Sequence, residues 1–142
     1  MEHVAIASTE AARKFILGGN ARVTIRSKVS GVWFSYRVRK SEDGSIFFVS
    51  VLTGSDNEGD YTYAGTLKPG ERFRHGVKSK IQAGAPSVKA FDWAWAQLLT
   101  KEALPETLEV FHEGRCGRCN RALTVPESIE SGFGPECINH IH

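Results

Sequence analysis

The sequence predicts an α+β fold in which helices pack on an antiparallel meander sheet, with a small additional module at the C-terminus. Three observations predict it. Apolar and polar residues alternate with period two through much of the first half of the chain. Two other segments have the apolar spacing of amphipathic helices. All the cysteines lie in one stretch near the C-terminus.

The segment STEAARKFILGGN predicts the first helix, because Ala12, Phe15 and Ile16 fall on one helical face. Ser8 or Thr9 is expected to cap this helix, and the Gly-Gly pair to end it. Next, ARVTIRSKVSGVWFSYRVRK alternates with period two on both sides of a Ser-Gly turn. It predicts two antiparallel strands.

Two further strands are expected in the segments that follow. IFFVSVL comes after the strong turn SEDGS and predicts a third, more fully buried strand, and YTYAGTL predicts a fourth. The stretch KPGERFRHGVKSKIQAGAPS is expected to be irregular, because Gly and Pro recur in it.

Residues 87–101 predict a second helix, and both Trp93 and Trp95 are assigned to the core. Its apolar stripe, which is expected to pack on the sheet, consists of Val88, Phe91, Trp95, Leu98 and Leu99. After Pro105, TLEVFHE predicts a short strand that leads into the cysteine segment. We therefore divide the chain into an α+β domain, residues 1–106, and a module packed on it, residues 107–142.

The stretch HEGRCGRCNRALTVPESIESGFGPEC contains every cysteine of the chain. The spacing Cys116-x2-Cys119-x17-Cys137-x2-His140 supplies a complete Cys3His set for a tetrahedral zinc ion. GRCNRAL predicts a knuckle and the start of a hairpin, and Pro135 can open a short helix that carries the last two ligands. Knuckle, hairpin and helix in this order form a treble clef. The sequence therefore predicts one structural zinc ion, because four protein ligands leave no position for water.

Two other histidines compete for the fourth position. His112 precedes Cys116 with three residues between them, and His142 is a more remote candidate. A redox-active Cys pair is expected inside a βαβ pattern, and no such pattern surrounds this one. Three structural thiols without a metal are the remaining alternative.

These residues resemble a family of small proteins of unknown function that bacteriophages and prophages encode. Its members end in the motif C-G-R-C-G-R-x-L-T-x-P-E-S-I-x-x-G-x-G-P-E-C, and the likeness extends upstream through FILGGNARVTIRSKVSGVWFSYRVRK, FVSVLTGSDNEGDYTYAGTL and AFDWAWAQLL. Asn120 replaces the glycine that usually follows the second cysteine, a change that a tight turn tolerates. A histidine just before the first cysteine is frequent in such sequences, so the resemblance favours His112 whereas the spacing favours His140. The resemblance implies a phage or mobile-element origin and action inside a bacterial cytoplasm, and it implies no reaction.

The net charge of +2 hides blocks of each sign. Residues 11–41 contain eight bases and no acid, whereas residues 42–60 contain five acids and no base. Such asymmetry can mark a binding surface. The candidate phosphate contacts on the first two strands and around the knuckle are Arg22, Arg26, Lys28, Arg37, Arg39, Arg115, Arg118 and Arg121. A second basic group lies in the irregular stretch and consists of Arg72, Arg74, His75, Lys78 and Lys80.

Aromatic side chains near these bases would add base stacking if they are exposed, namely Trp33, Tyr61 and Tyr63. The competing interpretation is a solvated sheet face whose bases pair with nearby acids. Acidic side chains also follow the third strand, at Asp56, Glu58 and Asp60. This segment is too short for the twelve-residue calcium loop, and we expect a solvated acidic loop.

The composition is that of a globular protein, and we expect this protein to act by binding. The chain of 142 residues is 41% hydrophobic and 24% charged, which suits one domain with a small appendage. It lacks a long apolar run and a signal-peptide pattern, so we expect a cytosolic protein with reduced thiols and no membrane partner. No recognisable catalytic motif is present. We expect nucleic-acid binding; the alternative is an anti-CRISPR-like phage protein that inhibits a host defence complex through protein contacts. The sequence leaves the oligomeric state open.

Overall fold

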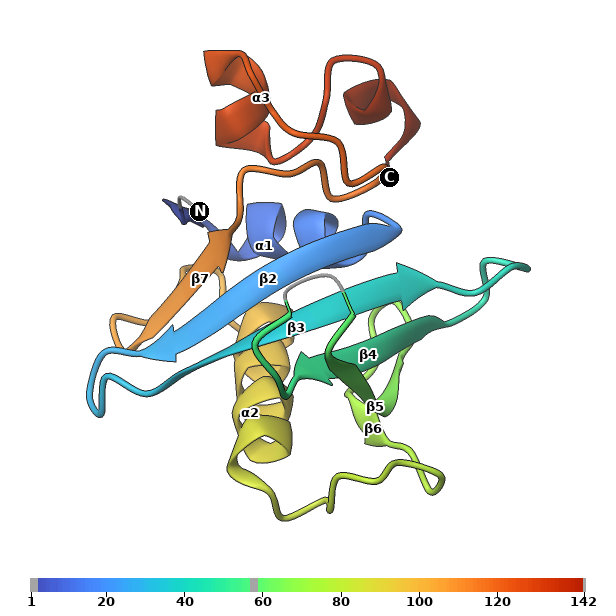
Figure 1. The fold of residues 1–142 in the computed structure, drawn as a ribbon. Coiled ribbons are helices and arrows are strands. Elements are labelled where there is room, and N and C mark those ends of the chain that lie inside the picture. The colour runs from blue at the N-terminus through green and yellow to red at the C-terminus, as the bar shows by residue number, and fades with distance from the viewer. Residues whose placement is uncertain (1–2, 57–58, 142) are drawn as a thin grey trace.

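The alternating segments form one antiparallel sheet in the computed structural model, which describes residues 3–56 and 59–141. Seven strands pair in the order β1-β7-β2-β3-β4-β5-β6 (Figure 1). Their bounds are β1 Val4–Ala5, β2 Asn20–Ser27, β3 Trp33–Lys40, β4 Phe47–Leu52, β5 Tyr61–Leu67, β6 Arg74–His75 and β7 Leu108–His112. Strands β2 to β5 are the expected meander, and the expected α+β class is confirmed.

Helix α1 (Thr9–Ile16) begins at Ser8, whose hydroxyl accepts a hydrogen bond from the Ala11 amide at 3.1 Å. The expected cap is therefore present, and it satisfies one of the amides that a helix start leaves unpaired. Phe15 and Ile16 are buried, and the ring of Phe15 packs against the rings of His112 and Phe133. The chain then turns through Gly18 and Gly19 into β2.

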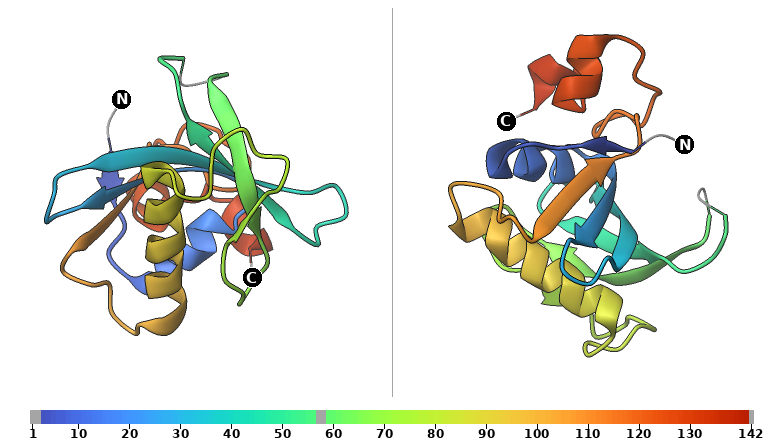
Figure 2. Two further views of the ribbon diagram at one scale, coloured as in Figure 1. Left: turned by 90° about the horizontal axis from the view of Figure 1, so that it is seen from below. Right: turned by 90° about the vertical axis from the view of Figure 1, so that its left-hand side faces the viewer.

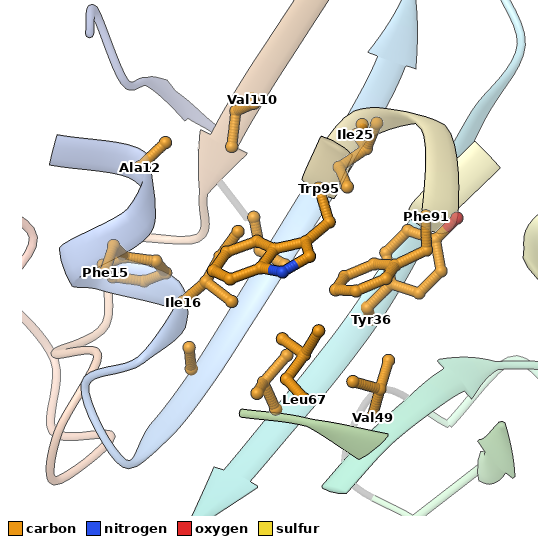
Figure 3. Close-up of a cluster of buried hydrophobic side chains, with 14 of the residues drawn as sticks. Ala12, Phe15, Ile16, Ile25, Tyr36, Val49, Leu67, Phe91, Trp95 and Val110 are labelled. Atoms are coloured by element: carbon orange, nitrogen blue, oxygen red, sulfur yellow. The ribbon is translucent and has the colours of Figure 1, made fainter. Parts of the chain in front are cut away.

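Helix α2 (Pro86–Thr100) lies across one face of the sheet, as Figures 1 and 2 show. Its stripe places Phe91 and Trp95 in the core, where the Phe91 ring lies 4.9 Å from the ring of Tyr36. Figure 3 shows Trp95 between residues of α1 and the inner face of β2 and β3. The indole nitrogen of Trp95 donates to the Glu71 carbonyl at 2.8 Å, so its one polar atom is satisfied.

The placement of Trp93 in the core was wrong. Trp93 is 42% exposed, whereas Trp95 is 1% exposed. A helix turns by about 100° per residue, so Trp93, two residues before Trp95, points to nearly the opposite side of α2. The Val88, Phe91, Trp95 and Leu98 stripe is buried as expected.

The C-terminal segment lies above α1 in Figure 1 and in the right-hand view of Figure 2, and it contains α3 (Pro126–Ser131) and the 3-10 helix η1 (Cys137–His140). Strand β7, which we had assigned to the C-terminal module, pairs with both β1 and β2 within the sheet. The short strands β1 and β6 had not been expected. Among the described residues, no helix has the length and apolar character that crossing a membrane requires.

Candidate metal centre

A tight hairpin positions the first two cysteines. The amide of Cys116 donates to the Arg121 carbonyl at 2.8 Å, and the amide of Asn120 donates back to the Cys116 carbonyl at 2.9 Å. Asn120 has a φ of 65°, the left-handed conformation that glycine and asparagine tolerate best. This explains how asparagine can stand where the resembling sequences have glycine.

Three thiols converge at one point. The sulfurs of Cys116, Cys119 and Cys137 all lie within 4.8 Å of one another. Cys116 and Cys137 are buried, Cys119 is exposed, and none of them forms a disulfide. Zn–S bonds of about 2.3 Å place two sulfurs of a tetrahedral site roughly 3.8 Å apart, so a small contraction would fit these thiols around one ion.

Backbone amides favour the thiolate form of Cys116. The amides of Gly134 and Arg118 donate to its sulfur at 3.3 and 3.4 Å. Burial alone would raise the pKa of Cys116, but the hydrogen bonds from Gly134, Cys119 and Arg118 outweigh it and hold the pKa below the ordinary value. Such N–H···S bonds orient sulfur ligands and stabilise their negative charge.

Burial dominates at Cys137 and raises its pKa, although the guanidinium of Arg118 donates to its sulfur at 3.5 Å and opposes the shift. The neighbouring thiols of Cys119 and Cys116 raise the pKa of Cys137 further. A cation bound between the three sulfurs would reverse this balance, because a coordinating thiol is deprotonated outright.

Both ring nitrogens of His112 form hydrogen bonds with the backbone. Its Nε2–H donates to the Ile129 carbonyl at 2.7 Å, and its Nδ1 accepts from the Gly114 amide at 3.0 Å. The ring is 1% exposed and lies 5.5 Å from the ring of Phe15. In this geometry neither nitrogen has a lone pair left for a metal. Burial lowers the pKa of His112, and the hydrogen bond to Ile129 opposes that shift.

The fourth ligand stays a prediction. Among the described residues, the group of converging ligand atoms contains the three cysteines, without His140 or His112. His140 is exposed at the end of η1, three residues after Cys137. His142 lies outside the described residues. A pocket of about 290 Å³ opens beside the thiols, so a fourth ligand can approach them from solvent.

The knuckle packs against the end of α1 with no space to spare. The amide of Asn20 donates to the Gly117 carbonyl at 2.9 Å, and the amide of Gly117 donates to the Gly132 carbonyl at 2.9 Å. A Cβ built on Gly18 would lie 2.6 Å from the Gly117 oxygen. The ring of Phe133, from the loop before η1, packs 5.9 Å from the ring of Phe15.

The proposed basic residues do not form one exposed face. Arg22 is 3% exposed, so its assignment as a phosphate contact was wrong. Val23 pairs with His112 at the end of β7, and the next residue along the chain, Glu113, is also buried. Arg22 and Arg37 both take part in further interactions.

The other predicted phosphate contacts are either engaged within the fold or exposed. Arg37 is half-buried and lies over the ring of Tyr61, and Arg115 donates to the Asn120 carbonyl at 3.1 Å. The exposed members lie at opposite ends of β2 and β3. At one end are Arg26, which faces Glu109 at 3.9 Å, and Lys28. At the other end are Arg39, Arg118 and Arg121.

Some side chains of the second basic group and of the acidic loop form ion pairs or hydrogen bonds within the fold. Arg72 pairs with Asp92 at 3.3 Å, and His75 Nε2 lies 2.7 Å from the Ile81 carbonyl. Asp60 accepts from the Asp56 amide at 2.8 Å. Glu58 lies outside the described residues. Arg74, Lys78 and Lys80 are exposed.

The aromatic residues differ in exposure. Trp33 is 57% exposed, whereas Tyr61 and Tyr63 are half-buried, and Tyr63 packs edge-on against Phe48 at 6.3 Å. Phe111 of β7, which the sequence had not singled out, lies near Trp33 on the same face. Its only sequence signal was the alternation within TLEVFHE.

Comparison with known proteins finds a match only for the C-terminal part of the chain. Residues 106–142 match a family described as a family of unknown function (DUF6011). No curated protein and no solved structure matches the chain. The matched segment contains β7 and the whole three-cysteine cluster, and it leaves β1 to β6, α1 and α2 outside.

Proposed function

We propose that the chain is a nucleic-acid-binding protein whose C-terminal segment is held by one structural zinc ion. Three converging cysteines support the metal, because clustered thiolates select zinc and other soft ions. The succession of knuckle, short hairpin and η1 supports a treble-clef-like module. His140 is the proposed fourth ligand, and η1 would have to move to bring it to the ion.

A helix-free sheet face is the observation that carries the nucleic-acid proposal. Helices α1 and α2 pack on the inner face, and in Figure 1 the other face, toward the viewer, has no helix among the described residues. Strand pairing places Arg26 beside Trp33 on that face, and Asn20 beside Arg39. Asn20 also bonds to Gly117 of the knuckle, so Arg118 and Arg121 are carried next to the same end of the sheet.

The first experiment combines metal analysis with binding. We expect one zinc per chain and binding of short oligonucleotides that weakens steeply as salt rises, because bound phosphates release counterions. Reversing Arg39→Glu and Arg121→Glu together should abolish binding and flatten the salt dependence. Reversal of two exposed lysines outside this surface, Lys68→Glu with Lys101→Glu, changes the net charge by the same amount; it is the matched control and should bind nearly as the parent does. Equal binding by both variants would refute the proposed surface.

The alternative function is that of a phage-encoded inhibitor of a host defence complex, acting in the bacterial cytoplasm. The observation that favours it is an apolar groove of about 550 Å³ between α2 and the β2–β3 hairpin, with Trp93, Val29 and Val32 exposed along it. Exposed apolar grooves of this kind mark protein contacts. If this function holds, Trp93→Ala should abolish inhibition of CRISPR targeting in cells and leave oligonucleotide affinity unchanged.

A further inference from the structure

An exposed tryptophan and an arginine stand side by side on the helix-free face. Trp33 begins β3 and pairs directly with Arg26 of β2, so their side chains project from the same face of adjacent strands. Trp33 is 57% exposed, which is unusual for the largest apolar side chain. On the other side of β2, Arg26 pairs with Glu109, whose carboxylate lies 3.9 Å from the guanidinium.

These residues border a pocket. It has a volume of about 300 Å³ and is lined by His3, Thr24, Arg26, Trp33 and Phe111. Phe111 pairs with Thr24 across the strands, and the His3 ring packs edge-on against it at 6.3 Å. The hydroxyl of Thr24 lies 2.8 Å from that of Ser35, in a buried hydrogen bond. The pocket therefore offers aromatic side chains and the cationic side chain of Arg26.

We propose that this pocket binds one nucleobase of a single-stranded nucleic acid. The inference rests on the proposed function and specifies its substrate. The indole of Trp33 is the stacking platform, and the guanidinium of Arg26 contacts the phosphate next to the stacked base. A base inside a duplex keeps both of its π faces against its neighbours, so only an unpaired base can stack on a protein side chain.

The strand partners of Arg26, which are Trp33 and Glu109, determine how it can contact a nucleic acid. The Glu109 carboxylate limits the motion of the guanidinium and offsets part of its charge. We therefore assign the affinity at this pocket mainly to stacking and a single phosphate contact. Stacking is tolerant of sequence, because every base has a π face, so the pocket should accept different bases with small differences.

The test uses a labelled twelve-nucleotide oligo-deoxythymidine strand and a hairpin duplex of equal charge, at the same salt concentration. The parent protein should bind the single strand more tightly than the duplex. Trp33→Ala should weaken single-strand binding roughly 5- to 150-fold, the range for loss of one stacking contact, without changing the salt dependence. Trp33→Phe should retain most of the affinity. Trp93→Ala, which removes an exposed tryptophan in the separate groove on α2, is the matched control and should bind as the parent does.

A spectroscopic readout separates contact from indirect effects. Trp93→Phe leaves Trp33 as the exposed tryptophan, because Trp95 is buried. In this variant the bound strand should quench tryptophan fluorescence, since a stacked base lies against the indole. The melting temperature of Trp33→Ala should equal that of the parent, because an exposed side chain contributes little to the core.

The outcomes distinguish this inference from the proposed function. Salt-sensitive binding that treats strand and duplex alike, or that Trp33→Ala leaves unchanged, overturns the pocket and leaves the proposed function standing. Absence of binding to either oligonucleotide overturns both. Loss of a protein partner in Trp33→Ala, with oligonucleotide affinity intact, would assign the pocket to protein contacts and overturn the inference.

Discussion

Substitution of Gly18 by alanine tests how closely the knuckle packs against the end of α1. A Cβ on Gly18 would lie 2.6 Å from the Gly117 oxygen and 2.7 Å from Cε1 of Phe133. One of these atoms belongs to the knuckle backbone, which cannot move without displacing its hydrogen bond from Asn20. Because Gly18 does not have a positive φ, alanine introduces no backbone strain of its own, and the effect is one of overpacking.

Overpacking of this kind typically destabilises a protein by about 1–3 kcal/mol. For a chain of 142 residues, that corresponds to a fall in melting temperature of roughly 3–9 °C. Urea and thermal unfolding followed by circular dichroism measure both quantities. Gly84→Ala is the matched control, because a Cβ there would meet nothing within 4 Å and its φ is not positive. It should leave stability unchanged or raise it slightly. If Gly18→Ala unfolds as Gly84→Ala does, the close packing inferred between the knuckle and α1 is wrong.

Three further predictions concern single residues. His112→Ala should lower the free energy of unfolding by roughly 2–4 kcal/mol, because it leaves a cavity and two unpaired backbone groups. Because His112 is not the proposed zinc ligand, metal analysis of this variant should find the same amount of zinc per chain as in the parent. The pKa of His112 lies below its ordinary value in the folded chain, so the unfolded chain binds a proton first and stability should fall as the pH drops below about 6.5. Because acid also releases metal, the measurement is the difference in urea stability between the parent and His112→Gln, which should shrink as the pH falls. Asn120→Gly should keep or raise stability, whereas Asn120→Ala should lower it by about 1 kcal/mol, because its φ is 65°; thermal unfolding of both variants checks this.

The local signals in the sequence were sufficient for the main elements. Period-two alternation located β2 and β3, the turn-rich segments before IFFVSVL and YTYAGTL located β4 and β5, and the apolar stripe located α2 within one residue of each end. The Ser8 cap and the Gly-Gly stop located α1. The spacing of the cysteines predicted that their sulfurs converge, which the structure confirms. Except for Cys137, which is separated from Cys119 by seventeen residues, these features depend on residues that are close together in the sequence.

Features that depend on distant pairing were missed. Strands β1 and β6 have two residues each, too few to show a period, and they form because a neighbouring strand edge is available. Arg22 alternates as an outward residue should, and the sequence does not show that β2 lies between β3 and β7, where Arg22 is buried. For these residues the tertiary pairing, and not the local pattern, decides the environment. Trp93 is different, because the helical period already places it opposite the predicted stripe of α2, and the sequence interpretation did not use that signal.

The path of the chain from β7 to the knuckle determines how far loss of the metal should reach. Strand β7 pairs with β1 and β2 through backbone contacts that involve none of the three cysteines, and the knuckle is tied to β2 at Asn20. Chelation should therefore release residues 123–141 to proteolysis and leave the sheet intact. Arg118 and Arg121 would lose their fixed positions, so salt-sensitive binding at that end should weaken. Trp33 pairs with Arg26, six residues from Asn20 along β2 and thus roughly 20 Å away. Quenching of Trp33 by the oligonucleotide should consequently survive chelation. If chelation abolishes both, the zinc ion supports the whole sheet, and the two ends of the face cannot be treated as separate sites.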